Sequence, residues 1–256
     1  MLTASGVHVT AWGDGETAVL VHGSFGWGTE TWRAQRPLAD SYKLLLLDRR
    51  GFGESPPDGR VDLERDADDV AALLGDGAHL VGHSYGGVVS LVAAARRPEA
   101  VRSLVLIEPP AFGVARGDPA VEELIRNIAA AARATEDPSE YRAAFLHAFG
   151  FPARATQLEG NNLSAARASM TERPPWEAEI PLDDLAHAGL RALLAQGDWC
   201  PAPESARARA GAAFRAVCDV LYDRLDAERA LFPSAHNPQK LGAVFNARVR
   251  SFWEAA

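Results

Sequence analysis

The chain has 256 residues, of which 47% are hydrophobic and 23% charged, and its formal net charge is −8. This length is enough to bury one sizeable core, and a single α/β domain commonly reaches it. An acidic chain without a basic stripe cannot neutralise phosphates, so a nucleic-acid partner is not expected. Two cysteines, Cys200 and Cys218, are too few for a disulfide framework or a cysteine metal site.

No targeting or membrane segment stands out. The N-terminus lacks the basic region and following apolar run of a secretory signal peptide. The most apolar stretches, 44–47, 88–95 and 104–107, are far too short to cross a bilayer. We therefore expect a cytoplasmic protein without a membrane partner. The oligomeric state stays open, with a homodimer among the alternatives.

Short runs rich in Val and Leu alternate with helical periodicity along most of the chain. This alternation is typical of a mostly parallel sheet that helices cover on both faces. It predicts strands over 7–12, 18–21, 43–47, 79–81, 103–107, 191–195 and 229–231. It predicts helices over 31–36, 63–74, 85–96, 203–225 and 240–253, the second of them capped by Asp62.

The interval 113–187 interrupts this alternation. It has no strand pattern, and its short helical segments over 120–134, 139–149 and 163–170 are separated by proline-containing breaks. A strand-free insert of this kind is most simply a helical cap over the C-terminal edge of the sheet, where ligands bind in open α/β folds. We therefore predict a core of residues 1–112 and 188–256 and a cap of residues 113–187.

The pentapeptide Gly82-His83-Ser84-Tyr85-Gly86 lies between a strand pattern and an apolar helix pattern. A serine at a sharp strand-to-helix turn is held in a strained conformation that exposes its hydroxyl. The chains come so close there that the positions two before and two after the serine must be small. The following helix points its N-terminus, with the Tyr85 N–H, to the place where an oxyanion would form. Ser84 is therefore the predicted nucleophile.

Three further motifs extend this pattern, and together the four resemble the α/β-hydrolase fold superfamily. They are a His-Gly loop at 22–26, a D-x-R-G-x-G-x-S turn at 48–55 and a histidine loop at 234–238. All of them stand in the family's order, and the resemblance covers essentially the whole chain. It implies a serine hydrolase with a mostly parallel central sheet flanked by helices and a helical cap inserted between two strands. No cofactor or metal is expected.

Serine is a poor nucleophile near neutral pH, so a base has to take its proton, and histidine is the side chain best suited to do so. His236 follows the last predicted strand and precedes the final helix, which places it in a loop above the sheet. We predict that it is the general base. The oxyanion hole needs two donors, for which we expect the N–H of Tyr85 and that of Ser24 or Phe25.

The carboxylate that orients the histidine stays open between Glu108 and Asp198. The family's acid usually follows the penultimate strand, but Cys200 occupies that position and Asp198 lies two residues earlier. Glu108 instead stands at the end of the strand beside the nucleophile strand. This position resembles that of the acid in haloalkane dehalogenases and in some lactonases that open resorcylic macrolactones such as zearalenone. Both candidates keep the chain order serine, acid, histidine.

These residues predict hydrolysis of a carboxylic ester or lactone through an acyl-enzyme on Ser84. We expect a small, apolar substrate and a pocket that includes Phe25, Trp27 and Trp176. The alternative is a non-hydrolytic member of the same fold, such as a lyase, a cyclase or a binding protein, because fold does not fix function. A dinucleotide-binding unit is disfavoured, since the early glycine-rich loop reverses the G-x-G-x-x-G spacing.

Overall fold

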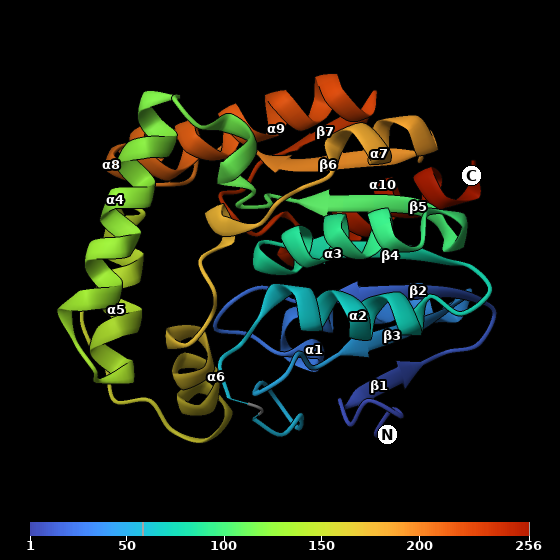
Figure 1. Cartoon of the computed structure of the whole chain (residues 1–256), viewed down its shortest axis with the longest axis horizontal. Helices are drawn as coiled ribbons and strands as arrows, with labels where there is room; N and C mark the ends of the chain where they lie inside the picture. The colour runs from blue at the N-terminus through green and yellow to red at the C-terminus, as the bar shows by residue number, and fades with distance from the viewer. Residues whose placement is uncertain (58, 256) are drawn as a thin grey trace.

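The computed structural model describes residues 1–57 and 59–255. A seven-stranded sheet with helices on both faces forms its core (Figure 1). The strand order is β1-β3-β2-β4-β5-β6-β7, in which β1 is antiparallel to its neighbour and the other pairs are parallel. Every predicted strand is present: β1 (Val9–Trp12), β2 (Glu16–Val21), β3 (Tyr42–Leu47), β4 (Ala78–His83), β5 (Val101–Ile107), β6 (Ala192–Gly197) and β7 (Glu228–Phe232).

The central strands are continuous apolar runs because both faces of the sheet are buried. Successive side chains of a strand point to opposite faces. Along β5, Leu104 and Leu106 join one hydrophobic cluster, whereas Val105 and Ile107 join the other. The first cluster includes side chains of α2 (Leu63–Leu73), α3 (Tyr85–Arg96), α7 (Leu182–Ala188) and α9 (Ala212–Leu225), and the second includes those of α10 (Ala243–Glu254).

Two predicted helices differ in form from a regular α-helix. The early one is a short α1 (Gly28–Thr31) followed by a 3₁₀ helix, η1 (Arg33–Asp40), which contains Pro37. Proline lacks the backbone N–H and clashes with the preceding turn, so a regular α-helix does not form there. The late one consists of α8 (Glu204–Ala206), a π-helical stretch η5 (Arg207–Gly211) and α9.

The helix predicted over 240–253 begins in the 3₁₀ helix η6 (Pro238–Leu241) and becomes α-helical only in α10, after Gly242. The remaining predicted helices lie within three residues of their predicted bounds. Asp62 caps α2 as predicted, because its side chain accepts a hydrogen bond from the N–H of Glu64 at 2.8 Å. In the described part of the chain, none of the helices combines the length and the apolar composition that a membrane span requires.

The segment between β5 and β6 stands mostly at one edge of the sheet. There α4, α5 and α6 lie beyond the ends to which the strand arrows point (Figure 1, left). By contrast, α7 packs against α9 and α3 beside the sheet. The segment comprises η3 (Phe112–Ala115), α4 (Pro119–Ala134), α5 (Pro138–Ala148), α6 (Gly160–Met170), η4 (Pro175–Glu177) and α7. The division into core and cap at 113 and 187 stays a prediction, and all of α7 except its last residue lies inside those bounds although the helix packs against α9 and α3.

Candidate active site

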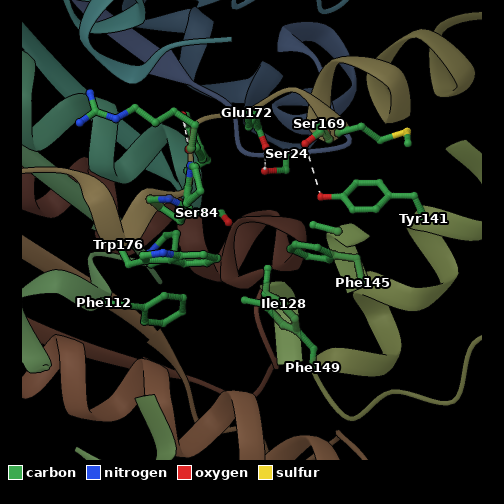
Figure 2. Close-up of a pocket in the computed structure, with 17 residues that line it drawn as sticks. Ser24, Ser84, Phe112, Ile128, Tyr141, Phe145, Phe149, Ser169, Glu172 and Trp176 are labelled. Atoms are coloured by element: carbon green, nitrogen blue, oxygen red, sulfur yellow. Dashed lines mark hydrogen bonds between the residues drawn. The ribbon is translucent and has the colours of Figure 1, made fainter. Parts of the chain in front are cut away.

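Ser84 lies at the turn from β4 into α3. Its φ of 52° and ψ of −127° are values that residues other than glycine rarely adopt. The turn is tight. A Cβ on Gly82 would lie 2.5 Å from the carbonyl oxygen of Gly86, and a Cβ on Gly86 would overlap the carbonyl oxygen of Val21. Both positions therefore exclude side chains. The serine hydroxyl points into a cavity that residues of α4 and α5 also line (Figure 2).

The imidazole of His236 reaches the serine from the loop between β7 and α10. Its Nε2 lies 2.9 Å from Ser84 Oγ, which is a hydrogen-bond distance. The loop comes this close because Gly197 has no side chain, and a Cβ there would overlap the carbonyl oxygen of Ala235. His83 Nε2 donates to the carbonyl oxygen of His236 at 3.0 Å and so ties the loop to the serine turn.

Of the two candidate acids, Glu108 faces the imidazole. Its Oε2 lies 3.8 Å from His236 Nδ1. Its Oε1 accepts hydrogen bonds from the backbone N–H of Gly197 at 2.7 Å and from the indole N–H of Trp199 at 3.3 Å. The side chain is buried, and this burial raises the pKa of Glu108 to about 8, because desolvation disfavours the charged form. Burial also lowers the pKa of His236, so its ring is held in the neutral form that accepts a proton.

Asp198 lies outside this group. Its Oδ1 accepts from the N–H of Cys200 at 2.9 Å in the turn that follows β6. Among the interactions of the described residues, none joins Asp198 to His236. The structure therefore brings Ser84, His236 and Glu108 together and leaves Asp198 apart.

The expected oxyanion donors lie on either side of the serine. Tyr85 begins α3, so its N–H belongs to the helix N-terminus. The loop after β2 approaches from the other side, and a Cβ on Gly23 would lie 2.7 Å from the serine Cβ. In that loop, the N–H of Phe25 donates to Ser169 Oγ at 2.9 Å. Of the two N–H groups expected from this loop, that of Ser24 is therefore the one left to face an oxyanion.

A buried charged cluster lies beneath this loop, and sequence reasoning missed it. Arg49 forms ion pairs with Glu172, from the segment after α6, and with Asp66 of α2, the latter at 2.9 Å. Glu172 also accepts from the hydroxyl of Ser24 at 2.5 Å. Burial raises the pKa of Glu172, while Arg49 acts to lower it. Glu172 lies in the segment between β5 and β6, where no motif marks it, so its contact with Ser24 has no signal in the sequence.

Two cavities meet at Ser84. The inner one has a volume of about 80 Å³, with polar groups at one end and aromatic rings at the other (Figure 2). The outer one has a volume of about 390 Å³ and extends past His236. Labelled residues of the inner cavity include Ser24, Tyr141, Ser169 and Glu172 at the polar end and Phe112, Ile128, Phe149 and Trp176 at the apolar end.

The three residues predicted to line the pocket lie in different places. Trp176 lines the inner cavity, and Phe25 lines the outer one. Trp27 lines neither of these two cavities, because it packs against a small cluster that contains Phe52 and Ala165. Its neighbour Phe25 has a φ of 61°, so the chain turns sharply between these two aromatic residues.

Comparison with known proteins identifies relatives of this chain. Residues 18–196 match the alpha/beta hydrolase fold family. The pimeloyl-[acyl-carrier protein] methyl ester esterase of Methylococcus capsulatus is 32% identical over 197 residues, which cover 74% of this chain and 74% of that protein. The esterase of the same name from Aeromonas hydrophila is 36% identical over 115 residues. That match covers 44% of this chain and only 45% of the Aeromonas protein.

Solved structures resemble the chain over almost its whole length. A hydrolase from Pseudomonas aeruginosa PA01 has a TM-score of 0.68 at 23% identity, with 98% of this chain and 96% of that chain covered. Est816, described as an N-acyl homoserine lactone degrading enzyme, has a TM-score of 0.63 at 20% identity, with 98% and 99% covered. At these identities the likeness concerns the fold alone. Together with the family match, it shows that the chain belongs to the α/β-hydrolase fold family, as the order of its motifs predicted.

Proposed function

We propose that this protein hydrolyses a carboxylic ester or lactone through an acyl-enzyme formed on Ser84. The observation that carries the proposal is the 2.9 Å contact between Ser84 Oγ and His236 Nε2 at a strained strand-to-helix turn. A serine hydroxyl held against a neutral imidazole is an activated nucleophile. Ser84 Oγ attacks the carbonyl carbon of the substrate while His236 Nε2 takes the hydroxyl proton.

Glu108 acts on the imidazole from its other side. When His236 becomes an imidazolium, a carboxylate near Nδ1 stabilises the new charge and fixes the ring orientation. The resting separation of 3.8 Å between Glu108 Oε2 and His236 Nδ1 is longer than a hydrogen bond. Catalytic hydrogen bonds are often long without substrate and tighten in the reacting complex, so this geometry supports the role.

The backbone N–H groups of Ser24 and Tyr85 stabilise the tetrahedral oxyanion from two sides. His236 then gives its proton to the leaving oxygen, the tetrahedral intermediate collapses, and the acyl group stays on Ser84. In the second half of the reaction His236 takes a proton from water as its oxygen attacks the acyl carbon. The second tetrahedral intermediate then collapses, His236 returns the proton to Ser84 Oγ as the bond from Oγ to the acyl carbon breaks, and the acid is released.

The two cavities support a small-molecule ester or lactone with unequal halves. The inner cavity is small beside the roughly 300–1,000 Å³ of typical ligand pockets, and one of its ends is aromatic. The outer cavity is larger, so we place a short apolar group of the substrate inside and the larger group outside. The esterase names of two relatives and the lactone-degrading description of Est816 agree with an ester or lactone as the bond that is cleaved.

The experiment is a panel of p-nitrophenyl esters and lactones, run beside covalent labelling with a fluorophosphonate. We expect turnover of part of the panel and labelling of Ser84. The Ser84→Ala variant should lose both, whereas Ser251→Ala, which changes an exposed serine of α10, should keep both. Retained turnover by Ser84→Ala refutes the proposal. Labelling without hydrolysis of any member would indicate a non-hydrolytic member of the fold.

A further inference from the structure

We propose that Trp199 is a positioning residue, whose indole N–H holds the carboxylate of Glu108 in the orientation that serves His236. The inference rests on the proposed function, because it concerns the acid of that hydrolytic site. It adds a residue that none of the sequence motifs marks, and it explains how an acid at the end of β5 is kept in place.

The hydrogen bonds of Glu108 divide unequally between its two oxygens. Oε1 accepts both N–H groups, from Gly197 at 2.7 Å and from the Trp199 indole at 3.3 Å. Oε2 faces His236 Nδ1 and has no hydrogen-bond partner in the described part of the chain. Turning the plane of the carboxylate away from this orientation would lengthen both hydrogen bonds to Oε1. The two donors therefore hold the plane of the carboxylate with one oxygen facing the imidazole.

Trp199, the residue whose indole donates to this carboxylate, has a strained backbone. Its φ is 60°, which is uncommon for a bulky residue. The side chain is 2% exposed, and its ring is stacked on that of Phe214 at 6.1 Å between centroids and an angle of 15°. The indole N–H is the only polar group of a tryptophan side chain, and leaving a buried donor unpaired costs free energy. Its bond to Glu108 satisfies that donor.

The helix that packs over the indole makes room for it. A Cβ on Gly211 would lie 3.0 Å from Trp199 Cγ and 3.1 Å from Cδ2. The φ of Gly211 is −57°, an ordinary helical value, so the backbone itself does not need glycine there. Gly211 ends the π-helical stretch η5, and such stretches often occur at functional sites. The space at Gly211 therefore serves the ring of Trp199.

The pairing of β5 with β6 explains why N–H donors at the end of β6 reach Glu108, which follows β5. Ile107 of β5 pairs with Ala195 of β6, so the residues that follow the two strands lie side by side. Glu108 follows β5, and Trp199 follows β6. The last residue of β6, Gly197, and the loop after it thus each contribute an N–H donor to Glu108, which follows the neighbouring strand. Both donors favour the ionised carboxylate, the form that stabilises an imidazolium.

Trp199→Phe deletes the N–H and keeps an aromatic ring, so it tests the inference directly. We expect kcat to fall about tenfold, as the loss of one hydrogen bond to a charged group predicts, with KM unchanged. We also expect the ionisation of Glu108 to move to higher pH in the profile of kcat/KM. In a Glu108→Gln background, Trp199→Phe should have no further effect, because the two residues act as one unit.

The matched control is Trp253→Phe, which deletes a buried indole N–H in the cluster on the opposite face of the sheet and should leave kcat and the pH profile unchanged. Gly211→Ala, which pushes on the same indole, is the second variant and carries the test if Trp199→Phe does not fold. Wild-type kcat and pH profile in Trp199→Phe overturn the inference, as does an equal loss in the Glu108→Gln background. If Ser84→Ala keeps turnover, the proposed function has failed instead.

Discussion

Glu108 Oε2 and His236 Nδ1 face each other at 3.8 Å, and neither atom has a hydrogen-bond partner among the described residues. Burial raises the pKa of Glu108 to about 8 and lowers that of His236, so the resting pair is uncharged near neutral pH. In the proposed reaction His236 takes the proton of Ser84 and becomes a cation next to a carboxyl group. Only an ionised Glu108 can stabilise that cation by its charge.

The first prediction concerns the pH dependence of catalysis. His236 acts as a base only when it is neutral. Because burial lowers its pKa, the imidazole stays neutral even at pH values somewhat below 6.5, the usual pKa of histidine. Glu108 acts best when ionised, which requires a pH above about 8. We therefore expect kcat/KM to rise further as the pH passes through about 8. Measurement from pH 5 to 10 checks this, and the upper rise should be absent from Glu108→Gln. A wild-type profile that is flat from pH 7 to 9 contradicts it.

The second prediction separates the two candidate acids. Glu108→Gln should lower kcat by about 10³-fold or more, because an amide cannot stabilise an imidazolium by charge. Asp198→Asn is the matched control, since the Asp198 side chain bonds to the N–H of Cys200 and not to His236. We expect its kcat to stay within about threefold of the wild type, as for a change remote from the reacting atoms. Steady-state kinetics on the best ester of the panel, with folding checked by circular dichroism, gives the comparison. A greater loss in Asp198→Asn would reverse the assignment.

The third prediction is that the same Glu108→Gln variant gains stability relative to the wild type as the pH rises. A carboxyl whose pKa is higher in the folded state favours folding below the unfolded pKa of about 4.5, and this contribution is lost as the pH rises to about 8. Glutamine does not titrate, so the variant lacks this loss. The difference in Tm between variant and wild type should therefore increase from pH 5 to pH 8. In a chain of this size, a change of about 1 kcal/mol in the free energy of unfolding shifts Tm by about 2–4 °C. A difference independent of pH would show that Glu108 does not titrate in this way.

The contact between Ser84 and His236 could be predicted from sequence because local features mark both residues. Ser84 lies in a turn whose glycines are required by close backbone contacts, and His236 follows the last strand of a regular alternation. The sheet was predictable for the same kind of reason, since strands buried on both faces are continuous apolar runs.

The acid could not be inferred with the same certainty, because Glu108 and Asp198 follow adjacent parallel strands. The distinction depends on the direction of each side chain, which the order of residues does not encode. Trp199 and Glu172 had no local pattern either, since each makes its contact across a long separation in sequence, Trp199 with Glu108 and Glu172 with Ser24. Trp27 was expected in the pocket only because its side chain is large and apolar. The chain turns at Phe25, and Trp27 packs against the cluster that contains Phe52 and Ala165.

The last prediction concerns the length of the group that the inner cavity accepts. Trp176 lines this cavity of about 80 Å³, and it also lines an open groove of about 720 Å³ between η3 and α7. In the described part of the chain, it is the one residue that lines both. We therefore expect its indole to form the wall that limits the inner group of the substrate. Trp176→Ala should connect the cavity to the groove and move the optimum of a p-nitrophenyl ester series to longer chains.

The readout is the ratio of kcat/KM between a long and a short ester, which we expect to increase about tenfold or more in Trp176→Ala, because burial of each additional CH₂ contributes about 0.8 kcal/mol. Trp27→Ala is the matched control, since this tryptophan packs against Phe52 and Ala165 outside both cavities at Ser84. Its ratio should equal that of the wild type. Because a ratio is independent of the fraction of folded enzyme, a loss of stability in either variant does not affect the comparison. An unchanged ratio in Trp176→Ala would mean that the short group of the substrate is limited by another part of the cavity.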